Sequence, residues 1–239
     1  MGALNKYFRF MMMDCTKYLL LFLSNLCYIL YVFFVIVLLF CVSGEWTGFM
    51  LLLEERIRKD GKILEGNVLK VDSFLNHQMD VELFREMGKE LARLYKDCGV
   101  NKILTIEASG IGIACVAALE FGCPAVFAKK YKTSNIADEV YSATVFSYTH
   151  GREYQIVVNK NYINENDRIL LIDDFLANGE ALAGLITLVR QSGATVVGAG
   201  IAIEKAFQPG GDKIRSMGVR VESLARIQSM SVTDGVVFC

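Results

Sequence analysis

The chain has 239 residues, enough for one domain of ordinary size and an appendage. Its 25 basic and 26 acidic residues give a formal net charge of −1, so we expect no electrostatic attraction to nucleic acid. Seven cysteines without a CxxC pair and only two histidines exclude a zinc-binding set and indicate buried thiols in a reducing compartment.

An uncharged apolar segment covers residues 18–42, a run of 25 residues. It exceeds the roughly 20 residues that span a bilayer, which predicts a membrane-anchoring helix. The basic residues on its two sides are nearly equal in number and indicate no orientation. The alternative is that residues 1–49 are translated from a misplaced start. We expect a hydrophobic extension at 1–49 and one folded domain at 50–239.

The first elements of the domain are a short strand and a helix. Residues 65–80 begin with an apolar strand and continue as a polar loop. Asp80 is expected to cap a helix that runs to about Asp97 and ends before Gly99. Apolar side chains at helical spacing follow the cap: Leu83, Met87, Leu91 and Leu94.

Buried strands then alternate with helices. The apolar runs expected as strands are 102–107, 124–130, 168–174, 195–205 and 218–227. We expect helices at 112–121 and 178–191, a hairpin at 144–159 and a mobile loop at 131–142. This order predicts an α/β fold with a mainly parallel twisted sheet flanked by helices.

Three of these strands end in charged residues: Glu107, the pair Asp173 and Asp174, and Glu204 with Lys205. Ligands of such sheets bind at the carboxyl ends of the strands, so these side chains predict one site at a common edge. The alternative is that each strand end exposes its charges to water.

The loop after Asp174 indicates the kind of ligand. Gly179 permits close backbone approach, Asn178 is a good N-cap, and the free N–H groups of the following helix suit a monophosphate. Ser109 and Gly110 predict a second, weaker cradle. Neither a GxxxxGK[ST] nor a GxGxxG motif occurs. Two acids beside a phosphate cradle, with no cationic side chain between them, suit a phosphorylated sugar bridged by magnesium, and one acid can serve as a general base.

Six segments in order carry a resemblance to a known family: VLKVDSFLNHQMD, TIEASGI, VFAKK, LLIDDFLANGEA, AIEKAFQPGGD and RVESLARIQS. The fourth resembles the phosphoribosyl pyrophosphate motif of type I phosphoribosyltransferases. Together they resemble the bacterial xanthine phosphoribosyltransferase family over residues 50–230. Residues 1–49 and the tail after Ser229 have no counterpart there, and Ala108 stands where a serine is usual.

The resemblance implies the type I phosphoribosyltransferase fold and transfer of a 5-phosphoribosyl group from phosphoribosyl pyrophosphate to xanthine. It implies that Asp173 and Asp174 are catalytic, at the ribose. The residues implied for the 5'-phosphate are Ala177, Asn178, Gly179, Glu180 and Ala181. Those expected at the pyrophosphate are Glu107, Ser109 and Gly110, and those implied for the purine are Leu69, Asn76 and Lys205.

The lysine also has a physical reading, because an ammonium donates to a 6-oxo group and selects against a 6-amino purine. The alternative for Lys205 is a side chain that reaches into water at a strand end. Phe207 can stack on the base or belong to the core. We expect the Glu180 side chain to point away from the phosphate and the loop at 131–142 to close over the substrates.

Further expectations concern partners and location. Mg²⁺ is expected with phosphoribosyl pyrophosphate and not on side chains alone. The family implies a homodimer, no nucleic acid and a cytoplasmic catalytic domain, with anchoring through residues 18–42 if the extension is real. The alternatives are transfer to guanine, hypoxanthine or adenine, a regulator that senses phosphoribosyl pyrophosphate, or a membrane protein with an inert soluble domain.

Overall fold

The computed structural model describes residues 51–131, 139–147 and 151–239. The membrane segment expected at 18–42, the boundary at residue 49 and the turn of the hairpin at 148–150 lie outside these residues. Within the described part of the chain, none of the helices is both long enough and apolar enough to cross a bilayer.

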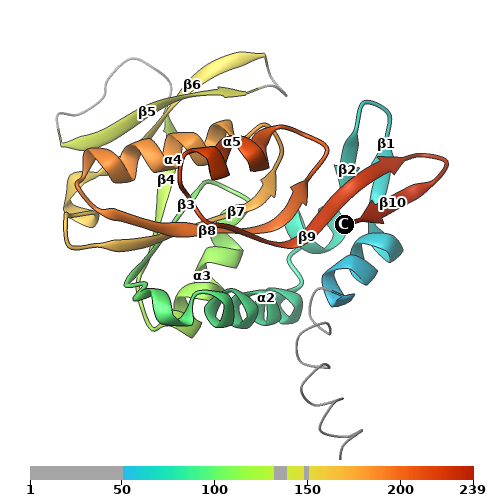
Figure 1. Ribbon diagram of the computed structural model, residues 1–239, viewed down its shortest axis with the longest axis horizontal. Coiled ribbons are helices and arrows are strands. Elements are labelled where there is room, and N and C mark those ends of the chain that lie inside the picture. Colours follow the sequence, from blue (N-terminus) through green and yellow to red (C-terminus); the bar gives the residue numbers. More distant parts are fainter. Residues whose placement is uncertain (1–50, 132–138, 148–150) are drawn as a thin grey trace, which may run out of the picture. The chain divides into compact units, whose positions relative to one another are not determined.

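A mixed sheet forms the centre of the described domain (Figure 1), with strand order β10-β9-β8-β7-β3-β4-β6-β5. Five neighbouring strands run parallel: β9 (Val221–Ser231), β8 (Thr195–Lys205), β7 (Arg168–Leu176), β3 (Lys102–Ile106) and β4 (Ala125–Tyr131). Antiparallel strands flank them: β10 (Gly235–Phe238), β6 (Arg152–Asn159) and β5 (Val140–Ser147). The mainly parallel α/β fold predicted from the sequence is confirmed.

Helices cover both faces of the sheet (Figure 1). On one face α2 (Val81–Leu94) and α3 (Gly110–Phe121) pack in an apolar cluster with residues of β7 and β8. On the other, α4 (Glu180–Gln191) and the short α5 (Gly210–Ser216) join a second cluster with β3, β7 and β8. Because both faces are covered, the central strands are apolar throughout, as the sequence indicated.

The helix α2 begins as predicted, since the Asp80 carboxylate accepts a hydrogen bond from the Leu83 N–H at 3.2 Å. It ends at Leu94, three residues earlier than expected, and a 3₁₀ turn, η2 (Lys96–Cys98), leads to Gly99. A second 3₁₀ turn, η3 (Lys160–Tyr162), follows β6.

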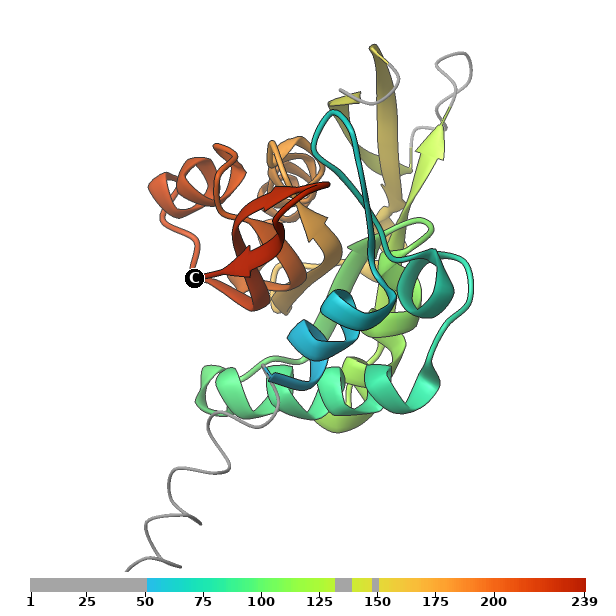
Figure 2. The same ribbon diagram turned by 90° about the vertical axis from the view of Figure 1, so that its right-hand side faces the viewer.

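Before α2, residues 51–60 are helical. They lead into a small antiparallel hairpin of β1 (Lys62–Leu64) and β2 (Val68–Lys70), and a π-helical turn, η1 (Asp72–Asn76), follows. Figure 2 shows this hairpin as a separate projection beside the main sheet. Its second strand was predicted and its first was not.

Several expected boundaries are wrong. α3 begins at Gly110 and α4 at Glu180, and the N-cap of α4 is Gly179 rather than Asn178. Of the loop expected at 131–142, Tyr131 belongs to β4 and residues 140–142 belong to β5. Residues 132–138 lie outside the described residues. β9 is 11 residues long, as is β8, and is therefore not the shorter strand that we expected. β10 was not predicted; its Val236 and Phe238 pack on the first apolar cluster.

Candidate active site

The two acids lie at the carboxyl end of β7. Asp173 is 6% exposed, and its Oδ1 accepts a hydrogen bond from the Asp174 N–H at 3.0 Å. Burial raises the pKa of Asp173 well above its ordinary value, and the negative charge of Asp174 raises it further. Burial also raises the pKa of Asp174. The strand therefore holds two adjacent carboxyls in an environment that favours a cationic or hydrogen-bonding ligand.

A cation that the sequence reasoning missed lies near this pair. Lys130, at the carboxyl end of β4, favours the ionised form of both aspartates and so opposes the rise in their pKa. The Lys130 Nζ is 5.6 Å from the centre of the Tyr154 ring. The signal was present, because the segment VFAKK ends a strand parallel to β7 with two lysines.

The loop between β7 and α4 forms the floor of a cavity of about 190 Å³. All five residues implied for the 5'-phosphate line it: Ala177, Asn178, Gly179, Glu180 and Ala181. Gly179 has φ +79°, a conformation that favours glycine, and it places the start of α4 against the cavity. The first N–H groups of a helix have no acceptor within the helix, so they are available to an anion.

The walls of this cavity come from elements that the sequence reasoning did not connect with it. Val145 and Phe146 of β5 and Tyr154 of β6 line it together with Asp173. Burial raises the pKa of Tyr154, and the charge of Asp173 raises it further, so the phenol stays protonated and can donate a hydrogen bond. The hairpin β5–β6 thus lines the same cavity as Asp173 and the loop at 177–181.

The loop between β3 and α3 leads to Gly110, which lies close to Asp173. A Cβ atom on Gly110 would meet the hydroxyl of Thr105 and lie 3.4 Å from the Asp173 Oδ1, so only glycine fits there. The Glu107 Oε1 accepts a hydrogen bond from the Lys130 N–H at 2.6 Å. Ser109 precedes α3 without a capping hydrogen bond from its side chain. The structure therefore brings both predicted cradles to one edge of the sheet.

Lys205 ends β8 and contacts the β1–β2 hairpin. Its Nζ donates a hydrogen bond to the Asn67 carbonyl at 2.8 Å and lies 5.6 Å from the centre of the Phe175 ring. Its hydrogen bond to Asn67 shows that the side chain does not simply extend into water, and burial lowers the pKa of Lys205. Leu69 lies on the same hairpin and is 6% exposed.

The remaining residue implied for the base, Asn76, ends η1. Its Oδ1 is buried and has no hydrogen-bond partner in the described part of the chain. A buried amide oxygen without a partner is costly unless a ligand supplies a donor. Phe207 is 39% exposed and is therefore not the core aromatic that one reading of the sequence allowed.

Glu204 is buried among basic side chains, so the expectation that it belongs to the site at the common edge of the sheet is wrong. The side chain is 1% exposed and pairs with Arg215 at 2.7 Å and Arg226 at 3.2 Å, and Ser223 donates to it at 2.6 Å. Burial alone would raise the pKa of Glu204, but the hydrogen bonds from Arg215 and Ser223 bring it below its ordinary value.

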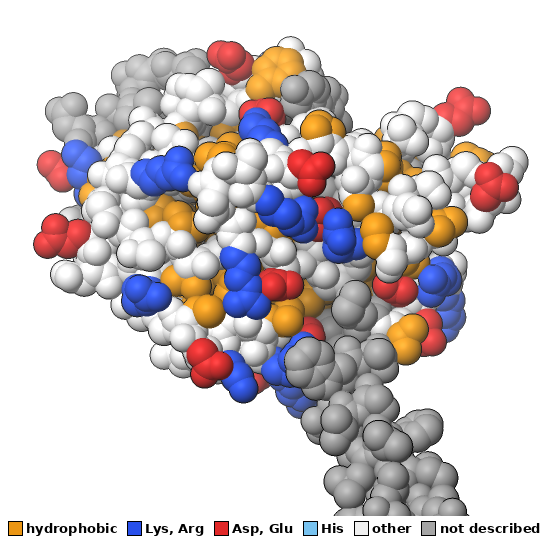
Figure 3. Space-filling model, in the orientation of Figure 1, with side chains coloured by type: hydrophobic (Ala, Val, Ile, Leu, Met, Phe, Trp, Pro, Cys, Tyr) orange, Lys and Arg blue, Asp and Glu red, His pale blue; other side chains and the backbone are white. Residues whose placement is uncertain are grey.

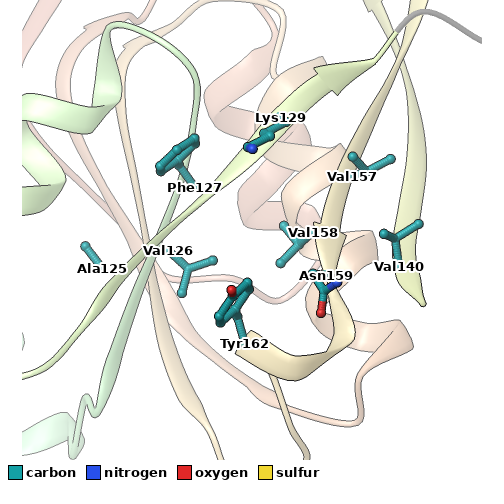
Figure 4. Close-up of a pocket in the computed structure, with 9 residues that line it drawn as sticks. All are labelled: Ala125, Val126, Phe127, Lys129, Val140, Val157, Val158, Asn159 and Tyr162. Carbon is teal, nitrogen blue, oxygen red and sulfur yellow. The ribbon is translucent and has the colours of Figure 1, made fainter. Parts of the chain in front are cut away.

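A larger cavity, of about 490 Å³, lies on the outer side of β4 and β6 (Figure 4). Its lining is mostly apolar and includes Val126, Val157 and Tyr162, with Lys129 the charged residue among them. It holds none of the residues predicted for the site and no carboxylate, so we place the candidate active site at the smaller cavity.

Several solved structures of adenine phosphoribosyltransferases resemble this chain, and they show its fold. The enzyme of Trypanosoma brucei gives a TM-score of 0.62 at 21% identity, over 73% of this chain and 79% of that one. The enzyme of Rhodothermus marinus gives 0.62 at 19% identity, over 76% and 99%. The architecture is therefore that of a type I phosphoribosyltransferase.

Proteins of similar sequence identify the family, although no family model matches the chain. Xanthine phosphoribosyltransferase of Lachnoclostridium phytofermentans is 58% identical over 188 residues, 79% of this chain and 97% of the relative. The protein of the same name from Bifidobacterium adolescentis is 56% identical over 186 residues, 77% and 96%. The chain belongs to the xanthine phosphoribosyltransferase family.

Proposed function

We propose that the protein transfers the 5-phosphoribosyl group of phosphoribosyl pyrophosphate to xanthine, giving xanthosine 5'-monophosphate and pyrophosphate in purine salvage. The observation that carries the proposal is the 58% identity over 97% of a relative named for this activity. The arrangement of two anion cradles around a pair of acids agrees with it.

The phosphorylated sugar is assigned to β7 and the loop after it. The N–H groups at residues 177–181 bind the 5'-phosphate, which is the kind of ligand that a helix start favours. Asp173 and Asp174 lie at the ribose, where a carboxylate accepts hydrogen bonds from vicinal hydroxyls. Glu107, Ser109 and Gly110 lie at the pyrophosphate, and the closeness of Gly110 to Asp173 supports this placement.

Magnesium is proposed to arrive with phosphoribosyl pyrophosphate. In the described part of the chain no three His, Cys, Asp or Glu side chains lie together as a metal site, and we assign the other ligands of the ion to substrate oxygens. Asp173 and Asp174 present the carboxylate oxygens that Mg²⁺ prefers, and they would help to hold it. The ion supplies charge neutralisation for the departing pyrophosphate.

The purine is assigned to Lys205, Leu69 and Asn76. The Lys205 ammonium has one donor on the Asn67 carbonyl, which leaves two for the 6-oxo group of a purine. An exocyclic 6-amino group would meet these donors with donors of its own, which disfavours adenine. The unpartnered Asn76 Oδ1 fits an N–H of the base.

The reaction is proposed to be a dissociative displacement at the ribose C1', with an oxocarbenium-like transition state. The carboxyls of Asp173 and Asp174 lie where positive charge develops on the sugar, and electrostatic stabilisation of that charge lowers the barrier. The vicinal pair is poorly suited to two separate proton transfers, so we assign both acids to positioning and charge stabilisation.

Two further proposals rest on the family alone. We propose a homodimer, which light scattering on the purified protein would test. We also propose a cytoplasmic domain at 50–239, with membrane fractionation of the full chain to test whether residues 1–49 anchor it. Basic and acidic side chains are interspersed on the face in Figure 3, which gives no support to a nucleic-acid partner.

The proposed function is tested by incubating the purified full chain with phosphoribosyl pyrophosphate, Mg²⁺ and xanthine, and separating the products by chromatography. We expect xanthosine 5'-monophosphate and pyrophosphate in equal amounts. Absence of both products, from a protein whose circular dichroism shows that it is folded, would refute the assignment.

A further inference from the structure

The short helix α5 lies between Glu204 and the phosphate loop and contacts both. It follows β8 after a turn of four residues, and it packs beside α4 (Figure 1). No residue of α5 lines the cavity of the candidate site. Its contacts therefore concern the shape of the loop rather than a ligand.

On the loop side, the Gly210 N–H donates a hydrogen bond to the Ala177 carbonyl at 2.9 Å. A Cβ on Gly210 would meet that carbonyl and lie 2.7 Å from the Gly179 nitrogen, so the two backbones are in direct contact. The Lys213 Nζ forms an ion pair with the Glu180 Oε1 at 2.6 Å, and Glu180 is the one acidic residue of the loop at 177–181. Helix α5 thus contacts three residues of the phosphate loop.

On the other side, Arg215 joins α5 to Glu204 of β8. Arg215 donates two hydrogen bonds to the Glu204 carboxylate, at 2.7 and 2.9 Å. A bidentate pair of hydrogen bonds between an arginine and a buried carboxylate is stronger and better oriented than a single hydrogen bond. Gly211 has no room for a Cβ, which would lie 2.5 Å from the Arg215 Nη1. The helix is therefore fixed against the strand that ends in Lys205.

We propose that Arg215, through Glu204, is a positioning residue for the 5'-phosphate loop. Its pair with Glu204 fixes α5, and α5 holds the backbone at Ala177 and Gly179 in the shape that presents N–H groups to the phosphate. The inference rests on the proposed function, because it assigns the loop to the sugar phosphate. It concerns the affinity for the phosphorylated substrate and not the selection of the base.

The test compares two arginines that pair with the same carboxylate. Arg215 lies on α5, which contacts the loop, whereas Arg226 lies on β9 and pairs with Glu204 at 3.2 Å. We expect Arg215→Ala to raise the KM for phosphoribosyl pyrophosphate about tenfold, the loss of roughly one charge-assisted hydrogen bond. The KM for the purine and kcat should change less than about twofold. Arg226→Ala should leave all three constants near wild type.

Two further measurements separate positioning from general destabilisation. Arg215→Lys keeps one donor to Glu204 and should restore part of the affinity. Titration calorimetry measures the affinity for ribose 5-phosphate, which tests phosphate binding at the loop without turnover. Arg215→Ala should weaken this binding, and Arg226→Ala should not. Equal effects of the two alanine variants would overturn the proposal. So would an increase in the KM for the purine that matches the increase in the KM for phosphoribosyl pyrophosphate. A wild-type protein that binds ribose 5-phosphate but forms no nucleotide would instead refute the proposed function.

Discussion

Replacing Gly179 by alanine tests the proposed phosphate loop, residues 177–181, at its centre. Gly179 has φ +79°, where an L side chain costs about 1 kcal/mol. Its new Cβ would lie 3.1 Å from the Gly210 Cα and 3.2 Å from the Gly210 oxygen, closer than the 3.4 Å at which ordinary contact begins. The loop and α5 must therefore move apart by about 0.3 Å, or the residue must leave its conformation.

Either movement turns the N–H groups at the start of α4 away from a bound phosphate. Loss of one hydrogen bond to a charged group costs about 1.5–3 kcal/mol. The KM for phosphoribosyl pyrophosphate is therefore expected to rise by about tenfold to a hundredfold. The KM for xanthine should stay near wild type, because Lys205 and Leu69 lie on other elements.

The matched control is Gly122→Ala at the end of α3. Gly122 also has a positive φ, +63°, and a Cβ there would meet nothing within 4 Å. We expect a similar loss of stability in thermal unfolding and unchanged kinetics. Initial rates with each substrate varied in turn provide the measurement. If Gly179→Ala keeps the wild-type KM for phosphoribosyl pyrophosphate, or if the two variants behave alike, the assignment of the loop is wrong.

Three other predictions concern single side chains at the acids and the base. Asp174→Asn should lower kcat about a hundredfold or more while circular dichroism stays unchanged, and near-normal turnover would remove Asp174 from the mechanism. Lys205→Ala should reduce the preference for xanthine over adenine in kcat/KM, by about tenfold or more, and an unchanged ratio would exclude a selective role for the lysine. Asp173→Asn should raise Tm at pH 8, because burial and the neighbouring charge raise the pKa of Asp173 and its ionisation then opposes folding. This gain should shrink as the pH falls through the raised pKa toward 4, the ordinary aspartate value, and a gain that grows on acidification would contradict the argument.

The sequence was informative where burial and periodicity act together. The central strands are covered on both faces, so their apolar runs stand out, and the point at which Asp173 interrupts a run marks the carboxyl edge of the sheet. Asp80 was found as a helix cap because its role depends only on residues next to it in the chain. The same holds for the loop at 177–181, which follows the acids after only two residues.

What the sequence could not supply depends on contacts between distant elements. Glu204 reads as one more acid at a strand end, and only the packing of Arg215 and Arg226 against it shows that it is buried and paired. Tyr154 reaches the cavity because β6 pairs with β4 and β5, a register that periodicity does not fix. β10 is a four-residue strand, and its stability comes from its pairing with β9.

The central claim is that this site transfers a phosphoribosyl group and selects xanthine among purines. Its most direct test is the kcat/KM of the purified full chain for xanthine, guanine, hypoxanthine and adenine, each with saturating phosphoribosyl pyrophosphate and Mg²⁺. We expect the highest value with xanthine and the lowest with adenine, whose 6-amino group cannot accept a hydrogen bond from Lys205. Equal or better use of adenine would contradict it.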